Sequence, residues 1–386
     1  MTATSAAATP ALLRRMNERT VLEAIRAGSP VSRAEISRRV GISKPTVSQA
    51  LRSLLDSGLV REAESGAADG PGYGATFFEP VPEAALVLGL DLGARFLRGA
   101  VCDLSGAVRA RQDIEVAGAE VGELLAATAE LKGTLLAASE LSPGAFDGAV
   151  IGIPGVIDRR TGRAALAENV HGLEGLDITA ELEQRLEVPV TVENDVNLAA
   201  LGEQWRGVGQ GVEDFVFLSV GTGLGAGLVL RGELHRGHHG FAGEVDYALD
   251  GHDPSAAAIS EYAAGLAAEG DHSTSLTSFD VRTIFGAARA GDPLGRAVVE
   301  EEARRIAVHV APIAAVADVA LVVVGGGIGA NGDLLLAPVR EQLAQLLPYP
   351  PDVQVSSLGD AAVLMGTLAV GLRAALDSVF VKSAGR

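Results

Sequence analysis

The 386-residue chain has one cysteine, one tryptophan and no apolar run of membrane-spanning length. With Cys102 alone, an intramolecular disulfide is impossible, which fits a reducing cytoplasm, and Cys102 is expected to be a small buried side chain. The best apolar run is interrupted by His309, Pro312 and Asp318. The alanine-rich N-terminus also lacks the apolar core of a signal peptide. We therefore expect a cytoplasmic protein that makes no contact with a membrane.

Positive charge is scarce as well, because the formal net charge of the chain is −18. A polyanion repels an acidic protein, so this total argues against nucleic acid as a partner. The charge is unevenly distributed, however, since residues 1–80 carry ten Lys and Arg against eight Asp and Glu. A mildly basic segment joined to an acidic body is typical of a DNA-reading domain fused to a ligand-binding domain.

The basic segment has the pattern of a winged helix-turn-helix. Apolar residues recur at helical spacing from Leu12 to Arg26, Ser32 and Glu35 form a capping box for a short second helix, and Ser43 caps a third. In this motif the later helix of the pair enters the major groove of DNA. Side chains expected to contact DNA are Arg33, Ser43, Lys44, Thr46, Ser48, Gln49 and Arg52. The alternative is a small helical module used for protein contacts.

Two short strands, Leu59–Arg61 and Ala75–Phe78, would form the wing around a glycine-rich tip. That tip, residues 70–74, contains no basic residue. We therefore expect the wing to contribute little to reading the minor groove.

The rest of the chain repeats one pattern, a buried strand followed by glycines, at Asp91, Gly221 and Gly325. This recurrence predicts two related α/β lobes around one cleft. Glycines as dense as those of 221–227 let the backbone approach an anion such as a phosphate, but tight hairpins use the same residues.

The stretch Pro189–Glu203 alternates toward a strand and then reads as a helix. Asn194, Asp195 and Asn197 therefore lie where a strand ends and a helix begins, which is the rim at which α/β proteins bind ligands. A carboxylate between two carboxamides can hydrogen-bond a polyhydroxylated ligand or take a proton from one hydroxyl. The competing interpretation is that these residues only cap the helix.

Together these motifs resemble the ROK family of repressors, open reading frames and kinases, and specifically its winged-helix regulators. The resemblance extends from Leu12 to about Leu376. The residues that carry it are Gly-Leu-Asp-Leu-Gly at 89–93, Gly-Ile-Pro-Gly at 152–155, Glu-Asn-Asp-Val-Asn at 193–197, Gly-Thr-Gly-Leu-Gly-Ala-Gly at 221–227, Ala-Gly-Glu at 242–244 and Gly-Gly-Gly at 325–327. It implies a winged helix-turn-helix followed by an actin-like, hexokinase-type pair of lobes with a sugar in the cleft.

The resemblance also implies site residues. In kinases of the family the carboxylate at the position of Asp195 is the base for the sugar hydroxyl. The sugar contacts that it implies here are Asn169, Asn194, Asp195, Glu244, Tyr247 and Glu261. The nucleotide site of the kinases corresponds to Asp91, Gly93, Gly221, Thr222, Gly223, Gly225, Gly325, Gly326 and Gly327, which we expect to be inherited scaffold.

Departures from the family pattern separate a sensor from an enzyme. Ala94-Arg95 replaces the Gly-Thr that follows the first Asp-x-Gly in the kinases, and a bulky arginine there would block the phosphate pocket, although its charge could also attract phosphate. Tyr247 replaces a histidine that binds sugar or structural zinc in relatives. The cysteine-rich zinc segment is missing, so no metal is expected and His252 and His272 are expected on the surface.

The sequence therefore predicts a sugar-responsive regulator, by default a repressor, and not an enzyme. Its partners would be operator DNA with an inverted repeat, a sugar or sugar phosphate, and further copies of the chain in a homodimer or tetramer; neither zinc nor ATP is expected. The alternatives are a ROK sugar kinase that carries a DNA-binding domain, with Asp195 catalytic, and a constitutive DNA-binding protein with an inactive cleft.

These interpretations divide the chain into six segments. They are a disordered N-terminus at 1–11, the winged helix-turn-helix at 12–79, a linker at 80–86, a first lobe at 87–199 and 358–376, a second lobe at 200–357, and a C-terminal tail at 377–386.

Overall fold

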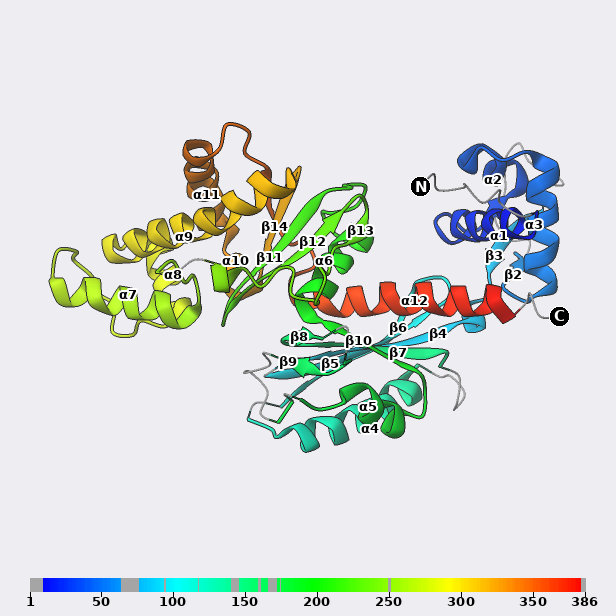
Figure 1. The fold of residues 1–386 in the computed structure, drawn as a ribbon, viewed down its shortest axis with the longest axis horizontal. Helices are drawn as coiled ribbons and strands as arrows, with labels where there is room; N and C mark the ends of the chain where they lie inside the picture. The colour runs from blue at the N-terminus through cyan, green and yellow to red at the C-terminus, as the bar shows by residue number, and fades with distance from the viewer. Residues whose placement is uncertain are drawn as a thin grey trace, which may run out of the picture.

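The computed structural model of the protein describes residues 10–63, 76–93, 95–116, 118–139, 146–158, 161–165, 172–173, 175–248 and 251–382. A winged helix lies at one end of an elongated molecule, and two lobes built on mixed sheets follow it (Figure 1). The helix-turn-helix and the paired α/β lobes that the sequence predicts are both present.

The winged helix consists of α1 (Pro10–Arg26), α2 (Arg33–Val40) and α3 (Lys44–Asp56), with a sheet of order β1-β3-β2. The strands are β1 (Val31–Ser32), β2 (Val60–Glu62) and β3 (Phe77–Pro80). Both predicted caps form, because Ser32 accepts from the Glu35 amide and Ser43 from the Thr46 amide. The wing tip at 70–74 lies outside the described residues.

The first lobe is a five-stranded sheet of order β10-β7-β4-β5-β6. Its strands are β4 (Leu86–Leu92), β5 (Phe96–Asp103), β6 (Val108–Glu115), β7 (Gly148–Ile153) and β10 (Val190–Asn194). Helices α4 (Val121–Ala138) and α5 (Ile178–Leu186) cover one face, and α12 (Ala362–Lys382) covers the other (Figure 1). A small pair, β8 (Val156–Ile157) and β9 (Ala164–Ala165), lies beyond β7.

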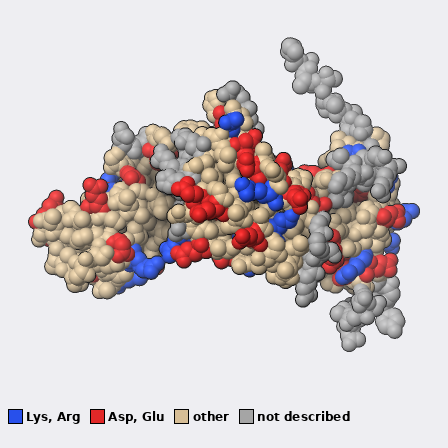
Figure 2. Space-filling view, turned by 90° about the horizontal axis from the view of Figure 1, so that it is seen from below, with Lys and Arg blue, Asp and Glu red and all other residues tan. Residues whose placement is uncertain are grey.

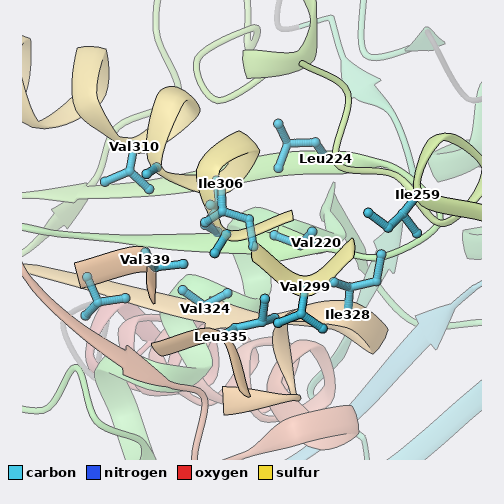
Figure 3. Close-up of a cluster of buried hydrophobic side chains, with 14 of the residues drawn as sticks. Val220, Leu224, Ile259, Val299, Ile306, Val310, Val324, Ile328, Leu335 and Val339 are labelled. Carbon is cyan, nitrogen blue, oxygen red and sulfur yellow. The ribbon is translucent and has the colours of Figure 1, made fainter. Parts of the chain in front are cut away.

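The second lobe is a five-stranded sheet of order β13-β12-β11-β14-β15. Its strands are β11 (Phe215–Val220), β12 (Leu224–Leu230), β13 (Glu233–Leu234), β14 (Leu321–Gly325) and β15 (Asp352–Val355). The helices beyond it are α7 (Ala256–Glu269), α8 (Val281–Ala290), α9 (Pro293–Ala317), α10 (Gly326–Gly329) and α11 (Gly332–Leu346). The core forms where valines and isoleucines of α9 and α11 meet those of β11 and β14 (Figure 3).

Helix α6 (Asp195–Arg206) joins the lobes, because it follows β10 of the first sheet and contacts β11 and β12 of the second. It also crosses α12 at two glycines, Gly202 and Gly366. A Cβ atom at Gly202 would overlap the carbonyl oxygen of Ala362, and one at Gly366 would overlap that of Leu198. The two backbones can therefore approach this closely only because neither crossing residue has a side chain.

Several expected segment boundaries differ from the helices and strands. Residues 80–86, expected as an extended linker, contain the end of β3, the 3-10 turn η1 (Pro82–Ala84) and the start of β4. Helix α6 runs through the expected division at 199/200, and α12 continues through residues 377–382 of the expected tail. One hydrophobic cluster connects the winged helix, β4, β5 and α12, so side-chain packing continues across these boundaries.

Two features that bear on membrane and redox chemistry lie in this cluster. Contrary to the prediction that no apolar run reaches membrane-spanning length, residues Gly359–Ser378 of the α12 region are long and apolar enough to span a membrane. More than half of this stretch is buried inside the protein, as in the core helix of a globular domain. Cys102 is fully buried, as expected, and burial raises the pKa of its thiol to about 12. Cys102 is therefore a packing residue with an unreactive thiol.

Candidate ligand cleft and nucleic-acid interface

The junction between β10 and α6 forms one wall of the cleft. Asn194 is the N-cap of α6, since its Oδ1 accepts from the Asn197 amide at 2.8 Å. Its Nδ2 donates to the Gly155 carbonyl at 2.9 Å. Both ends of the Asn194 side chain therefore bond within the protein, and Asn194 caps the helix while it also lines the cleft. Asp195, the first residue of α6, accepts from the Val196 amide at 2.8 Å and lines the cleft.

A buried glutamate supports this junction from behind. Glu193 Oε1 accepts from the Asn194 amide and from Asn197 Nδ2, each at 3.0 Å, and Oε2 accepts from Arg236 Nε at 2.5 Å. Sequence reasoning missed both Glu193 and Arg236. The signal available was only the position of Glu193 in the Glu-Asn-Asp motif, and nothing in the sequence pairs it with an arginine 43 residues away.

The cleft has a volume of about 1330 Å³ and is lined from both lobes. Asn194 and Asp195 belong to the wall just described, and Glu244 and Tyr247 line it from the second lobe. Of the nucleotide-site glycines, Gly221, Gly223, Gly225, Gly326 and Gly327 line it, together with Thr222. Four of the six predicted sugar residues and much of the predicted nucleotide site therefore share one cleft.

The acids of the cleft are held away from water. Burial, together with the nearby Asp91 carboxylate, raises the pKa of Asp195 to about 7. Burial also raises the pKa of Asp91 to about 6, against the effect of the Arg98 guanidinium 3.1 Å away. The pKa of Glu244 is raised by burial and then by Asp246. At neutral pH Asp195 is thus divided between its two protonation states and can donate or accept a hydrogen bond.

One of the predicted sugar contacts, Glu261, does not come to this cleft. Glu261 is exposed on α7 and is not among the described residues that line the cleft, whereas its neighbour Ser260 is. The helical direction explains the difference, because adjacent residues on a helix point to different faces. Asn169 lies outside the described residues, as does Ala94.

The position of Arg95 differs from the expectation that this residue blocks the phosphate pocket. Arg95 pairs with Glu115 of the edge strand β6 at 3.3 Å and is not among the described lining residues. Arg98, the third residue of β5, lines the cleft instead and lies directly opposite Asp91 in the β4–β5 ladder. Arg95 precedes β5 and is held at the edge of the sheet by its pair with Glu115.

The glycine tracts serve partly as packing positions. Residues 221–223 form the turn of the β11–β12 hairpin, while Gly225 and Gly227 lie in β12 against α6. A Cβ at Gly227 would lie 2.6 Å from the Val196 carbonyl oxygen. Gly325, at the end of β14, packs against the Phe217 ring, and Gly93 forms the β4–β5 turn through a 3.0 Å bond to Phe96. Residues 221–223 therefore form a tight hairpin turn and also line the cleft.

No group of three or more His, Cys, Asp or Glu is placed to hold a metal ion among the residues that the structure describes. The segment after Tyr247 is held by α9 instead. Arg305 donates to the Asp253 carbonyl at 2.7 Å, and the His309 ring lies 3.0 Å from the His252 carbonyl oxygen. His252 and His272 are half-buried rather than on the surface.

The candidate DNA-reading surface lies on α3 and the turn before it. Ser43, Lys44, Gln49 and Arg52 are exposed, and Thr46 is half-buried with its hydroxyl 2.9 Å from that of Ser43. Ser48 is engaged within the protein, because its hydroxyl donates to the Lys44 carbonyl at 2.8 Å and accepts from Arg33 at 3.2 Å. Ser48 and Arg33 thus join α2 to α3, which sequence reasoning did not anticipate.

The charge of the two lobes contrasts with that of the DNA-reading surface. On the face drawn in Figure 2, Asp and Glu side chains are spread along the two lobes, with Lys and Arg between them. Sequence-independent attraction of DNA would therefore come from the winged helix and not from the lobes.

Comparison with known proteins identifies two regions of the chain, the N-terminal winged helix and the two lobes that follow it. A model of the ROK family matches residues 87–373, and a model of the MarR family matches residues 13–69. The xylose repressor of Caldicellulosiruptor bescii is 29% identical over 387 residues, which cover 93% of this chain and 96% of the repressor. The glucokinase of Halalkalibacterium halodurans is 28% identical over 306 residues, which cover 72% of this chain and 92% of the kinase.

The fold of the whole chain also has a solved counterpart. A ROK family transcriptional regulator, described as a homolog of the E. coli MLC protein, superimposes with a TM-score of 0.77 at 22% identity. The superposition covers 96% of this chain and 98% of that one, so the winged helix and both lobes share its fold.

Proposed function

The chain belongs to the ROK family, and we propose that it is a transcriptional repressor whose family domain binds a sugar effector. The observation that carries the proposal is the presence, in one chain, of an exposed helix-turn-helix and a cleft lined by Asp195 and Glu244. The similarity to a xylose repressor over nearly the full length of both chains supports it. Such a regulator acts on DNA in the cytoplasm.

The sugar would lie between the two walls of the cleft. Asp195 and Glu244 accept hydrogen bonds from hydroxyl groups, and Asp195 in its protonated form can donate one. Asn194 orients the wall as the cap of α6, and Tyr247 closes the opposite side. Asn169 and Glu261 stay predicted contacts. The effector is a sugar or a sugar phosphate.

A regulatory role is favoured over catalysis by the surroundings of Asp91. This carboxylate is 4% exposed and does not line the cleft among the described residues, whereas its partner Arg98 does. A nucleotide phosphate and its cation would have to displace that guanidinium. The sugar kinase remains the alternative, since Asp195 and the turn at 221–223 are present and a glucokinase is among the relatives.

The DNA partner would be an operator with an inverted repeat. Lys44 and Arg52 are exposed on α3, where they can contact phosphates, and Gln49 is exposed where it can contact a base edge. A homodimer with two-fold symmetry places two such helices about one helical turn of DNA, or a multiple of it, apart.

The deciding experiment is a thermal-shift screen of the full chain against sugars and sugar phosphates, followed by operator release with each sugar that binds. We expect a sugar that raises the Tm of the wild type and releases DNA, and we expect Asp195→Ala and Glu244→Ala to lose both effects. Glu269→Ala, an exposed carboxylate on α7, is the matched control and should retain both. Sugar shifts that survive in both cleft variants would contradict the proposed site.

A coupled assay with ATP and the sugars that bind separates regulator from kinase. Turnover by the wild type that Asp195→Asn abolishes would make the protein an enzyme. Operator release by sugar without turnover supports the regulator.

A further inference from the structure

Two aromatic rings lie exposed on the second-lobe side of the cleft. Phe241 is 43% exposed and Tyr247 is 60% exposed, and their ring centroids are 5.6 Å apart with a tilt of 56° between the planes. Tyr247 lines the cleft, and Glu244 lies between the two residues in the chain. Neither ring belongs to the hydrophobic clusters of the described chain. Large half-exposed rings beside a polar cleft indicate a binding surface and not a core.

The backbone holds the rings in a fixed relation to Glu244. Gly243 adopts a φ of +107°, its carbonyl accepts from the Ala226 amide at 2.8 Å, and a Cβ at this position would overlap the Ala226 carbonyl. The Glu244 amide donates to the Phe241 carbonyl at 3.3 Å, and residues Val245–Ala248 continue as the 3-10 turn η2. The rings and the acid therefore belong to one turn that is fastened to β12.

The size of the cleft exceeds what one sugar ring requires. Its volume of about 1330 Å³ is above the range of roughly 300–1,000 Å³ that encloses most drug-sized ligands. A single ring held by Asp195 and Glu244 would leave room in the cleft, which Tyr247 lines and which Phe241 adjoins through its contact with Tyr247. Aromatic faces suit the next part of a sugar chain, since a sugar ring presents C–H groups on its faces and hydroxyls at its edge.

We propose that Phe241 and Tyr247 form an aromatic platform for a second sugar ring, so that the effector contains at least two linked sugar rings. This inference rests on the proposed sugar-binding function of the same cleft. The first ring lies against Asp195 and Glu244, and the second stacks on the platform. Specificity for a two-ring effector follows, because a monosaccharide makes only the first set of contacts.

Calorimetric titration of the full chain tests the platform with matched ligands: xylose, glucose and galactose, each beside its α- and β-linked disaccharides. We expect one disaccharide to bind the wild type roughly threefold to tenfold more tightly than its monosaccharide. Phe241→Ala, a residue outside the predicted sugar contacts, should remove that difference and leave monosaccharide affinity within about threefold. Tyr247→Ala should weaken the disaccharide more than the monosaccharide, whereas Tyr247→Phe should keep the difference. Tyr349→Ala, an 88% exposed tyrosine outside the cleft, should change nothing.

The possible outcomes distinguish a failure of the aromatic platform from a failure of the proposed sugar-binding function. A wild type that binds the monosaccharide as tightly as its disaccharides overturns the platform and leaves the sugar sensor in place. Platform variants that weaken both ligands equally overturn it too, since the rings would then contact the first sugar. A wild type that binds operator DNA but neither class of sugar overturns the sugar-responsive function itself.

Discussion

Arg19 of α1 and Asp377 of α12 form an ion pair across the junction between the winged helix and the first lobe, with 2.6 Å between Arg19 Nη1 and Asp377 Oδ1. The same helix α12 crosses α6, whose first residue is Asp195. One helix therefore contacts both the DNA-reading domain and the helix that carries the cleft carboxylate. In Figure 1, α12 runs from the region of α6 to the winged helix.

The first prediction concerns coupling through this ion pair. Asp377→Ala should change the free energy of unfolding by less than about 1 kcal/mol, because both side chains are partly exposed and such pairs contribute little. If α12 transmits the effector signal, the sugar concentration for half-release of operator should shift by roughly twofold to tenfold. The measurement is operator release in a fluorescence-anisotropy titration with sugar.

Arg373→Ala is the matched control for coupling. Arg373 also lies on α12, but its partner is Glu233 of β13 in the second lobe and not a residue of the winged helix. It should leave the release midpoint unchanged. Equal shifts in the two variants would show that any change on α12 alters release, and the junction ion pair would then have no particular role.

The second prediction concerns the crossing of α6 and α12. Gly366→Ala would place a Cβ on the backbone carbonyl of Leu198, which cannot rotate away as a side chain could. The helices must then separate, and we expect the free energy of unfolding to fall by about 1–3 kcal/mol. Gly133→Ala is the control, because Gly133 is exposed on α4 and no other atom lies near the position of an added Cβ. This variant should have a free energy of unfolding about 0.5–1 kcal/mol higher than the wild type. Urea denaturation of both variants measures the difference, and equal stabilities would contradict the close crossing.

The third prediction separates phosphate contacts from base contacts on α3. Lys44→Ala and Arg52→Ala should weaken the binding of operator and unrelated DNA alike. Each should reduce the magnitude of the slope of log K against log salt concentration by about one. Gln49→Ala should instead weaken only the operator, by about 1–3 kcal/mol. Arg296→Ala, an exposed arginine on α9, should affect neither DNA. A loss of affinity in Arg296→Ala as large as in Lys44→Ala would show that the lobes and not α3 attract DNA.

Local patterns in the sequence were sufficient to predict much of the fold. Ser32 and Ser43 cap their helices as predicted, because a hydroxyl before a helical run has few other partners. The β10–α6 boundary at Asn194 was predicted as well, because an asparagine carboxamide before a helical run can also accept from a backbone amide. Strand β6 was not predicted, since it is an edge strand with mostly exposed polar side chains and carries little apolar alternation.

The parts of the site that depend on distant pairing could not be predicted. Which of Arg95 and Arg98 lines the cleft depends on where β5 begins and on its register with β4. The Arg236–Glu193 pair joins two lobes through a contact that no local pattern records. Glycines at 225, 227 and 325 resembled a phosphate loop but serve the packing of α6 and Phe217, because small residues suit both purposes.

The last prediction concerns Glu302, a fully buried carboxyl on α9 with no hydrogen-bond partner for either oxygen in the described structure. Burial raises its pKa to about 8, although the Arg305 guanidinium acts in the opposite direction. The folded state therefore holds a proton that the unfolded state releases near its ordinary value, and this group makes stability fall as pH rises from about 5 to 8.

Glu302→Gln replaces the protonated carboxyl by a neutral group of the same shape. The variant should match the wild type near pH 5 and exceed it by on the order of a few kcal/mol at pH 9, measured by urea denaturation across that range. Glu300→Gln, exposed on the same helix, should follow the wild type throughout. A Glu302→Gln curve that stays parallel to the wild type would mean that Arg305 keeps Glu302 ionised in the folded protein, and α9 would then contain a buried ion pair instead of a buried acid.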